Sequence, residues 1–171
     1  DDAAAVIIAA QHNKQRLELR GLGTKTALGN QPDYDDCLDV SAMHGIIDYQ
    51  PEELVLTVRA GTELSVIEAE LTKANQMLAF EPANLSGILT VESTGTIGGV
   101  LATNLSGPRR LTAGAARDFL LGFDAVSGRG ERFKSGGRVM KNVTGYDLSK
   151  LICGSYGTLA VVDEVTIKTL P

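Results

Sequence analysis

Residues 136–171 read GGRVMKNVTGYDLSKLICGSYGTLAVVDEVTIKTLP, a stretch that combines more structural signals than any other part of the chain. It joins a glycine-rich loop, a short helix, a second glycine turn and a closing strand. Asp147 can cap the helix at its start, and Gly154 can end it. The glycines at 145, 154 and 157 let the backbone come close to a flat or anionic ligand, because no Cβ stands in the way. The stretch therefore predicts a ligand site built largely on backbone atoms.

The composition is typical of one soluble globular domain. The chain has 171 residues, 43% hydrophobic and 22% charged, so it can bury a core without disulfides. Its net charge of −5 argues against a nucleic-acid surface that follows phosphates. The two cysteines are too few for a disulfide framework and favour a reduced, cytoplasmic setting. The longest apolar run, Ala3 to Ala10, is too short to span a bilayer and lacks the basic start of a signal peptide.

Local patterns predict a mixed α+β domain. A helix is expected after Gly61, capped by Thr62 or by Ser65 in a capping box with Glu68. The other expected elements are a helix over 3–13, strands at 17–20, 37–40, 46–49 and 54–59, a hairpin of 119–127 and 131–134, a helix at 148–152 and a strand at 158–170. This order favours α+β over a regular doubly wound sheet. Because the sequence starts within a helical pattern and stops on a strand-like one, we expect a fragment of a longer protein.

A first glycine cluster, Arg20-Gly-Leu-Gly-Thr-Lys-Thr26, follows directly after a predicted strand. Such a turn can direct successive backbone N–H groups at a diphosphate, with hydroxyl donors from Thr24 and Thr26. It is neither a Walker loop nor a Rossmann fingerprint, since the spacing and the third glycine differ. Taken alone, the cluster is better explained as a tight surface turn.

A second cluster runs Thr94-Gly-Thr-Ile-Gly-Gly-Val-Leu-Ala-Thr-Asn-Leu-Ser-Gly-Pro-Arg-Arg110. Gly98 and Gly99 open a short apolar segment, and Asn104, Ser106 and Gly107 close it. Small residues here would admit a flat ring system and present amides to its heteroatoms. They fit equally well a helix start that packs tightly against a neighbour. The residue pattern alone does not choose between these two hypotheses.

Together and in this order, the three clusters closely resemble the FAD-binding domain of vanillyl-alcohol-oxidase-type (PCMH-type) flavoproteins, and most of all the FAD-binding subunits of glycolate oxidases. The first resembles the family's Arg-Gly-Gly-Gly-Thr pyrophosphate loop, from which Leu22 departs. The second resembles its Thr-Ile-Gly-Gly…Ala-Thr-Asn signature. The third resembles its Gly-x-x-Gly-Thr-Leu-Gly-Val turn, in which Ala160 replaces a glycine. Each match alone is weak, whereas the joint match over residues 17–171 is specific.

The resemblance implies a set of residues that contact FAD, including a loop at Pro82 that borders the flavin. These are Arg20, Gly21, Leu22, Gly23, Thr24, Lys25, Pro82, Thr96, Ile97, Gly98, Gly99, Thr103, Asn104, Ser106, Gly107, Gly154, Gly157 and Val161. Residues 21–29 hold no histidine for covalent attachment, so the FAD is expected to be noncovalent. His12 and His44 have no partners at metal spacing, and we expect no metal. No catalytic base is assigned, because relatives take substrate-handling residues largely from a C-terminal domain.

The resemblance also implies an architecture and an activity. Residues 1–171 would form a small parallel α/β subdomain and a larger, mixed and largely antiparallel one, with FAD between them. The flavin would take a hydride from the α-carbon of a 2-hydroxy acid and leave a 2-oxo acid. Partners would be the other glycolate oxidase subunits, namely a second flavin subunit and an iron–sulfur subunit. The setting would be cytoplasmic, peripherally at the inner membrane through those partners.

Other classes of function stay open. The chain could be a noncatalytic FAD or electron-relay module, whose partner subunit performs the oxidation. It could also belong to another enzyme of this fold, such as a cell-wall precursor reductase or the flavin domain of a molybdenum hydroxylase. A purely structural protein would leave the three glycine clusters unexplained.

Several side chains carry their own expectations. Arg109, Arg110 and Lys141 are candidates for contacting diphosphate or a partner subunit, whereas Arg129, Arg132, Lys134 and Arg138 fit a solvated face. Tyr146 is expected to be buried against the closing helix, and Cys153 to be a small core residue. Ile97, Val100 and Leu101 are expected to form an apolar surface that stays exposed in a fragment.

Overall fold

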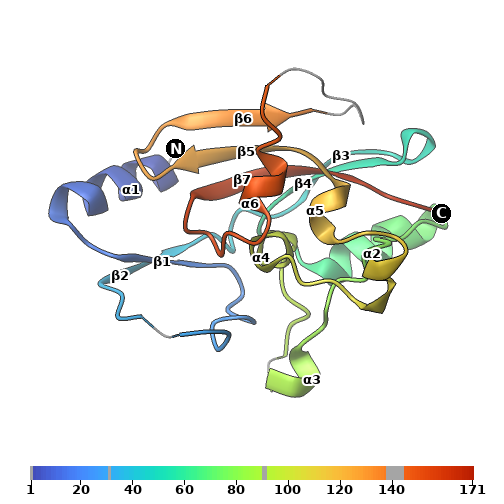
Figure 1. The fold of residues 1–171 in the computed structure, drawn as a ribbon, viewed down its shortest axis with the longest axis horizontal. Helices are drawn as coiled ribbons and strands as arrows, with labels where there is room; N and C mark the ends of the chain where they lie inside the picture. The colour runs from blue at the N-terminus through green and yellow to red at the C-terminus, as the bar shows by residue number, and fades with distance from the viewer. Residues whose placement is uncertain (1, 31, 90–91, 138–144) are drawn as a thin grey trace.

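The computed structural model describes residues 2–30, 32–89, 92–137 and 145–171, and it contains a small sheet and a larger one (Figure 1). The larger sheet has five strands in the order β3-β4-β7-β5-β6, and the smaller has β1 beside β2. The elements are α1 (Asp2–Asn13), β1 (Leu17–Arg20), β2 (Asp36–Asp39), β3 (Ile46–Gln50), η1 (Pro51–Glu53), β4 (Val55–Arg59), α2 (Leu64–Lys73), α3 (Ser86–Leu89), α4 (Ile97–Thr103), η2 (Pro108–Leu111), α5 (Ala116–Phe119), β5 (Leu120–Ser127), β6 (Arg132–Gly136), α6 (Ser149–Ile152) and β7 (Ala160–Lys168).

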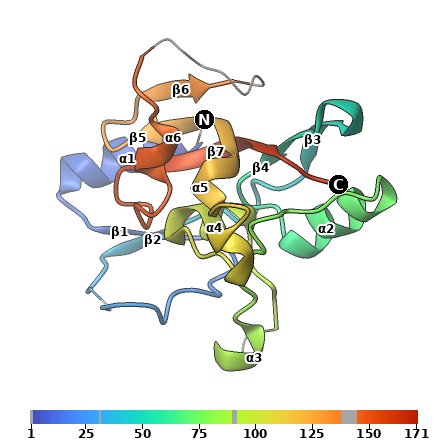
Figure 2. The same ribbon diagram turned by 45° about the vertical axis from the view of Figure 1, so that its right-hand side comes forward.

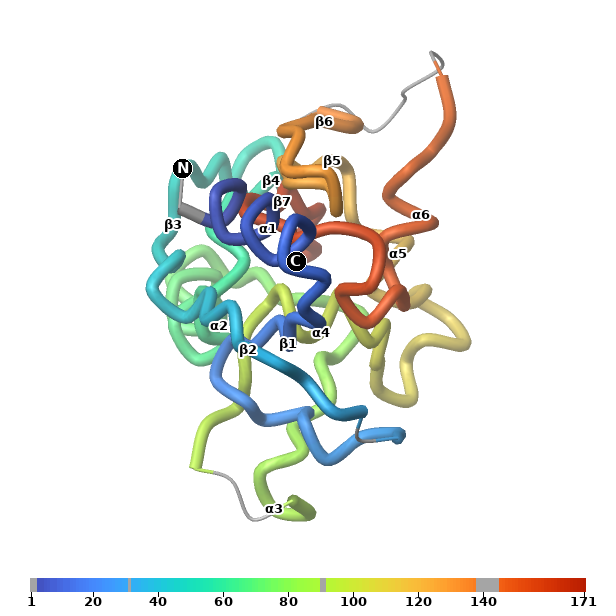
Figure 3. Tube along the Cα trace, turned by 90° about the vertical axis from the view of Figure 1, so that its left-hand side faces the viewer, coloured from blue at the N-terminus to red at the C-terminus, as the bar shows by residue number. Residues whose placement is uncertain are grey.

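The small sheet is parallel, and a minor apolar cluster joins it to the larger sheet. β1 and β2 pair in register from Leu17 with Asp36 to Arg20 with Asp39. Ile7 of α1 packs with Val40, Val126 and Val161, so α1 and the small sheet cover one end of β5 and β7 (Figure 3). This cluster fixes where the loop after β1 lies relative to the rest of the domain.

The larger sheet is antiparallel throughout, and its other face carries the main core (Figure 2). Leu56 and Val58 of β4 and Val165 and Ile167 of β7 are fully buried against α2, α4, α5 and α6. Phe80 stacks at a tilt on Phe119, with 5.5 Å between ring centroids. A small parallel unit beside a larger antiparallel one confirms the predicted α+β class.

Some local predictions about helix starts are wrong. Neither Thr62 nor Ser65 caps α2, which begins one residue after Glu63. The Thr62 hydroxyl instead donates to the carbonyl of Arg59 at 2.7 Å, and it accepts from the amide of Gly45 at 2.9 Å. Asp147 does not cap α6 either, because that helix starts after Leu148 without a side-chain cap.

Of the predictions about which side chains are buried, some are wrong and one is confirmed. Tyr146 is 92% exposed, so the prediction that it packs against the closing helix is wrong. Ile97 and Val100 are fully buried and Leu101 is 2% exposed, so the predicted exposed apolar surface is also wrong. The reason is that α4 is a core helix beneath the sheet, and the domain buries these side chains by itself. Cys153 is buried, as predicted.

No helix among the described residues is long and apolar enough to cross a membrane.

Candidate cofactor-binding site

The loop after β1 presents backbone donors that no other part of the described chain uses. Residues 21–25 lie between β1 and the turn in which Thr26 donates to the carbonyl of Gly23. Within the described residues, the amides of positions 21 to 25 donate no hydrogen bond. Gly23 has a φ of +69°, which bends the loop in a way that favours glycine. Successive free N–H groups in such a bend suit an anion such as a diphosphate.

Lys25 adds a positive charge to this loop. Its Nζ lies 3.3 Å from the hydroxyl of the buried Thr24, and burial lowers the pKa of its ammonium. Among the described residues it forms no ion pair. An anionic ligand would supply the counter-ion that this partly desolvated cation lacks.

The second cluster packs directly against the first. A Cβ built on Gly95 would lie 2.7 Å from Thr24 Oγ1 and 2.8 Å from Lys25 Nζ. A Cβ on Gly21 would lie 3.2 Å from Thr96 Oγ1. The loops at 20–26 and 94–99, far apart in sequence, therefore form one surface. Gly95 has a φ of +91° and was not among the residues predicted from sequence, although the Thr94-Gly-Thr96 spacing could have indicated it.

The amides at the start of α4 are already used. Those of Ile97 and Gly98 donate to the carbonyls of Thr62 and Ala60 at 3.0 and 2.8 Å. The amide of Gly99 donates to the Thr96 hydroxyl at 3.1 Å. The expectation that this segment offers amides to a ring is therefore wrong for Ile97, Gly98 and Gly99. The free donors lie in the first loop instead.

Gly98 and Gly99 have different surroundings, which resolves the two hypotheses for this pair. A Cβ on Gly98 would lie 2.8 Å from the carbonyl oxygen of Ala60 and 3.0 Å from its Cβ. A Cβ on Gly99 would lie 3.3 Å from Thr96 Oγ1 and 3.6 Å from Lys25 Nζ. Gly98 therefore serves helix packing, whereas Gly99 faces the loop surface.

The third cluster reaches the same region. A Cβ on Gly157 would lie 2.8 Å from Leu19 Cδ2, so this turn rests on β1. The amides of Gly154 and Tyr156 donate to the carbonyls of Leu101 and Ala102 at the end of α4. Val161 belongs to the minor apolar cluster with α1, so its side chain serves packing. The three glycine clusters therefore lie close together around β1 and α4.

The residues that close the second cluster hold the fold together. Asn104 Oδ1 accepts from the amide of Arg117 at 3.1 Å, and Ser106 Oγ accepts from that of Ala116 at 3.0 Å. The Thr103 hydroxyl donates to the carbonyl of Gly99 at 2.8 Å. Gly107 N donates to the carbonyl of Glu81 at 2.7 Å, beside the bridge between Pro82 and Ser106. Their described polar contacts are therefore architectural.

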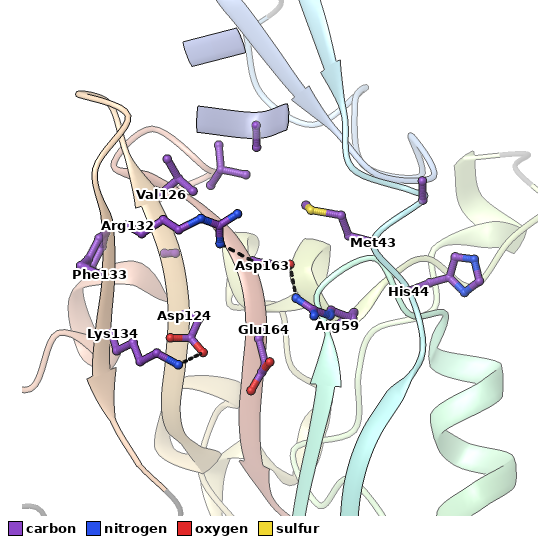
Figure 4. A pocket seen from close by; sticks show the side chains of 14 residues that line it. Met43, His44, Arg59, Asp124, Val126, Arg132, Phe133, Lys134, Asp163 and Glu164 are labelled. Atoms are coloured by element: carbon purple, nitrogen blue, oxygen red, sulfur yellow. Dashed lines mark hydrogen bonds and ion pairs between the residues drawn. The ribbon is translucent and has the colours of Figure 1, made fainter. Parts of the chain in front are cut away.

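A hollow of about 890 Å³ lies elsewhere, on the sheet face that α1 partly covers (Figure 4). Asp163 bridges Arg59 at 2.7 Å and Arg132 at 3.4 Å there, and Lys134 pairs with Asp124 at 2.9 Å. Of the predicted site residues, only Val161 lines it. Arg59, Arg132 and Lys134 are paired there, so the loop surface, where the amides and Lys25 have no such partners among the described residues, is the better candidate for a nucleotide site.

Two other expectations concern charge and metal. The Arg109 guanidinium lies 3.2 Å from Met77 Sδ, and the backbone amide of Arg109 donates to the Glu81 carboxylate at 2.9 Å. Both contacts are therefore made to other residues of this protein. Arg138 and Lys141 lie outside the described residues. Within residues 2–30, 32–89, 92–137 and 145–171, no group of His, Cys, Asp and Glu could hold a metal ion.

Comparison with known proteins defines the class. A family profile described as "FAD binding domain" matches residues 1–136, most of the chain. The chain therefore belongs to this family of FAD-binding domains. The geometry fits the cofactor, because free amides and an unpaired ammonium suit a diphosphate.

Individual relatives show more narrowly which members of the family this chain resembles. Glycolate oxidase subunit GlcE of Escherichia coli (strain K12) is 45% identical over 159 residues, which is 93% of this chain and 43% of the relative. Glycolate oxidase subunit GlcD of Bacillus subtilis (strain 168) is 31% identical over 173 residues, 100% of this chain and 35% of the relative. The chain thus spans less than half the length of these relatives. A solved alkyldihydroxyacetonephosphate synthase superposes with a TM-score of 0.74 and 20% identity over 97% of this chain and 29% of that one, a likeness of fold.

Proposed function

We propose that this chain binds FAD noncovalently and serves as the cofactor-binding part of a glycolate-oxidase-type enzyme that converts a 2-hydroxy acid to a 2-oxo acid. The observation that carries FAD binding is the loop at 21–25, whose amides donate no hydrogen bond and whose Lys25 forms no ion pair within the part of the chain that the structure describes. The substrate class is supported by relatives named glycolate oxidase subunit GlcE, 45% identical, and D-lactate dehydrogenase of Anaerostipes hadrus, 29% identical, because glycolate and D-lactate are both 2-hydroxy acids.

The chain's own part in this activity is to hold and orient the cofactor. The amides of 21–25 and Lys25 bind the diphosphate, and Gly95 and Gly99 keep that surface free of side chains. When bound, FAD supplies a ring that accepts a hydride equivalent from the α-carbon of the substrate.

The partners belong to the same proposal. The names GlcE and GlcD denote subunits of glycolate oxidase, so we place this chain in a multi-subunit enzyme. Within it, a second flavin subunit and an iron–sulfur subunit would carry electrons onward. The assembly would lie in the cytoplasm, peripherally at the inner membrane through those partners.

Noncovalent attachment has a direct test. Acid precipitation of the FAD-loaded protein is expected to release all the yellow flavin into the supernatant, since no described side chain of the loop is a histidine or cysteine. The measurement is the absorbance of supernatant and redissolved pellet. Flavin that remains with the pellet contradicts the proposal.

The redox role is tested on the complete protein with its partner subunits. Anaerobic addition of glycolate is expected to bleach the flavin absorbance, and D-lactate serves as a comparison substrate. Bleaching only when a partner subunit is present would favour the electron-relay alternative. Bleaching by NADPH but not by either hydroxy acid would favour a reductase of the same fold.

A further inference from the structure

The hollow of about 890 Å³ beside α1 contains two carboxylates that belong to directly opposite residues of the sheet. Asp124 of β5 and Glu164 of β7 are Cα partners, and both line the hollow (Figure 4). Like charges at directly opposite positions of neighbouring strands destabilise a sheet. Such a pair needs cations nearby to offset the repulsion.

The cations of the hollow compensate this pair only in part. Lys134 bonds Asp124 Oδ2 at 2.9 Å, whereas Asp124 Oδ1 is buried and accepts no hydrogen bond from the part of the chain that the structure describes. Arg59 is the Cα partner of Glu164 on β4, but its guanidinium bonds Asp163 at 2.7 Å. Within residues 2–30, 32–89, 92–137 and 145–171, the Glu164 carboxylate forms no hydrogen bond or ion pair. Negative charge therefore remains between Lys134 and Arg59.

A β-bulge in β7 produces this arrangement. The register of β5 against β7 shifts after Asp124 and Glu164, and it skips Asp163. As a result Asp163 and Glu164, which are neighbours in sequence, both line the hollow. Regular pairing would have directed one of these two acids to the other face of the sheet. Bulges commonly redirect a side chain next to a functional site.

We propose that this hollow is a docking site for a partner subunit, and that an arginine of that subunit binds Glu164 and Asp124. This rests on the proposed function, which places the chain in a multi-subunit enzyme. A guanidinium is planar and carries several N–H donors, so one arginine can bond two carboxylates at once. The exposed side chains of Arg132 and Lys134 border the hollow, and α1 covers it only in part. An open, charged surface suits a protein partner, whereas small-molecule sites enclose most of their ligand.

The test measures binding of the complete protein to the separately purified second flavin subunit and iron–sulfur subunit. It compares Glu164→Gln with the matched control Glu68→Gln, an exposed carboxylate of α2 on the other side of the sheet. Glu164→Gln is expected to weaken binding to one of these subunits by about 10- to 100-fold, because a hydrogen bond between charged groups is lost. Rising salt is expected to weaken the wild type more than this variant. The control is expected to bind like the wild type.

Readouts on the isolated protein separate docking from folding and from cofactor binding. The melting temperature of Glu164→Gln is expected to equal or exceed that of the wild type, because the repulsion from Asp124 is removed. Its flavin content is expected to be unchanged. A fall in melting temperature would show that Glu164 serves the fold, and a loss of flavin would place it at the cofactor; either result overturns the inference.

The binding results themselves are decisive. Full affinity of Glu164→Gln for both subunits, or equal weakening by Glu68→Gln, contradicts the inference, while flavin absorbance and bleaching by glycolate test the proposed function separately. A wild type that holds FAD but binds neither subunit overturns the inference together with the partner part of the proposed function. Restored binding between Glu164→Arg and a subunit in which one arginine is replaced by glutamate would confirm the contact and identify that arginine.

Discussion

The variant Gly98→Val is expected to lose about 3 kcal/mol of folding free energy, even in the absence of FAD. The first added carbon alone would lie 2.8 Å from the carbonyl oxygen of Ala60, a backbone atom at the end of β4. The helix cannot move away without losing the hydrogen bond from Gly98 N to that same oxygen, 2.8 Å long. Urea denaturation of the apo-protein measures the loss.

The neighbouring Gly99→Val is the matched control for this prediction. Its first added carbon would meet the Thr96 hydroxyl at 3.3 Å and the flexible end of Lys25 at 3.6 Å, and the latter can shift. We therefore expect near-normal melting of the apo-protein but markedly weaker FAD binding. Equal destabilisation by the two substitutions would show that the pair acts only in packing.

The second large effect is expected for Asn104→Val, with a loss of about 3 kcal/mol in folding free energy. Asn104 ends α4 with a φ of +52°, a conformation that β-branched residues strongly disfavour. The substitution also removes the oxygen that accepts from the amide of Arg117 at the start of α5. One residue thus connects two helices, and its loss is expected to loosen both.

The matched variant Asn104→Gly separates the two contributions. Glycine tolerates the positive φ and lacks only the acceptor, so we expect about half of the loss. Chemical denaturation of both apo-proteins gives the difference. A full loss in Asn104→Gly would assign the effect to the hydrogen bond rather than to backbone strain.

Much of the fold could be predicted because its signals are local. The strand at 17–20, the helix over residues 64–73 and the hairpin after Phe119 follow from alternation, helical spacing and a glycine turn. The predicted capping of α2 by Thr62 was wrong because the Thr62 hydroxyl bonds the amide of Gly45, a partner distant in sequence. The burial of α4 was missed because its apolar face meets a sheet whose central strand comes last in the chain.

The candidate site could be predicted from sequence as a set of glycine clusters, whereas the surroundings of its individual residues could not. The loop at 20–25 was predicted as a candidate cofactor contact, and the structure adds that the amides of 21–25 donate no hydrogen bond within the described residues. Sequence could not separate Gly98 from Gly99, because the difference depends on Ala60, which lies far away along the chain. Asn104 and Ser106 looked like ligand contacts because polar residues at a turn suit both roles. Their described contacts hold α5 in place.

The position of β7 has a consequence for biosynthesis. β7 pairs with both β4 and β5, yet it follows every other strand in the sequence. While the chain emerges from the ribosome, β3–β4 and β5–β6 can form only as separate ribbons, each with an open edge. Closure of the sheet must wait for residues 160–168, so the nascent chain passes through a stage in which a chaperone or a neighbouring nascent chain can compete for those edges.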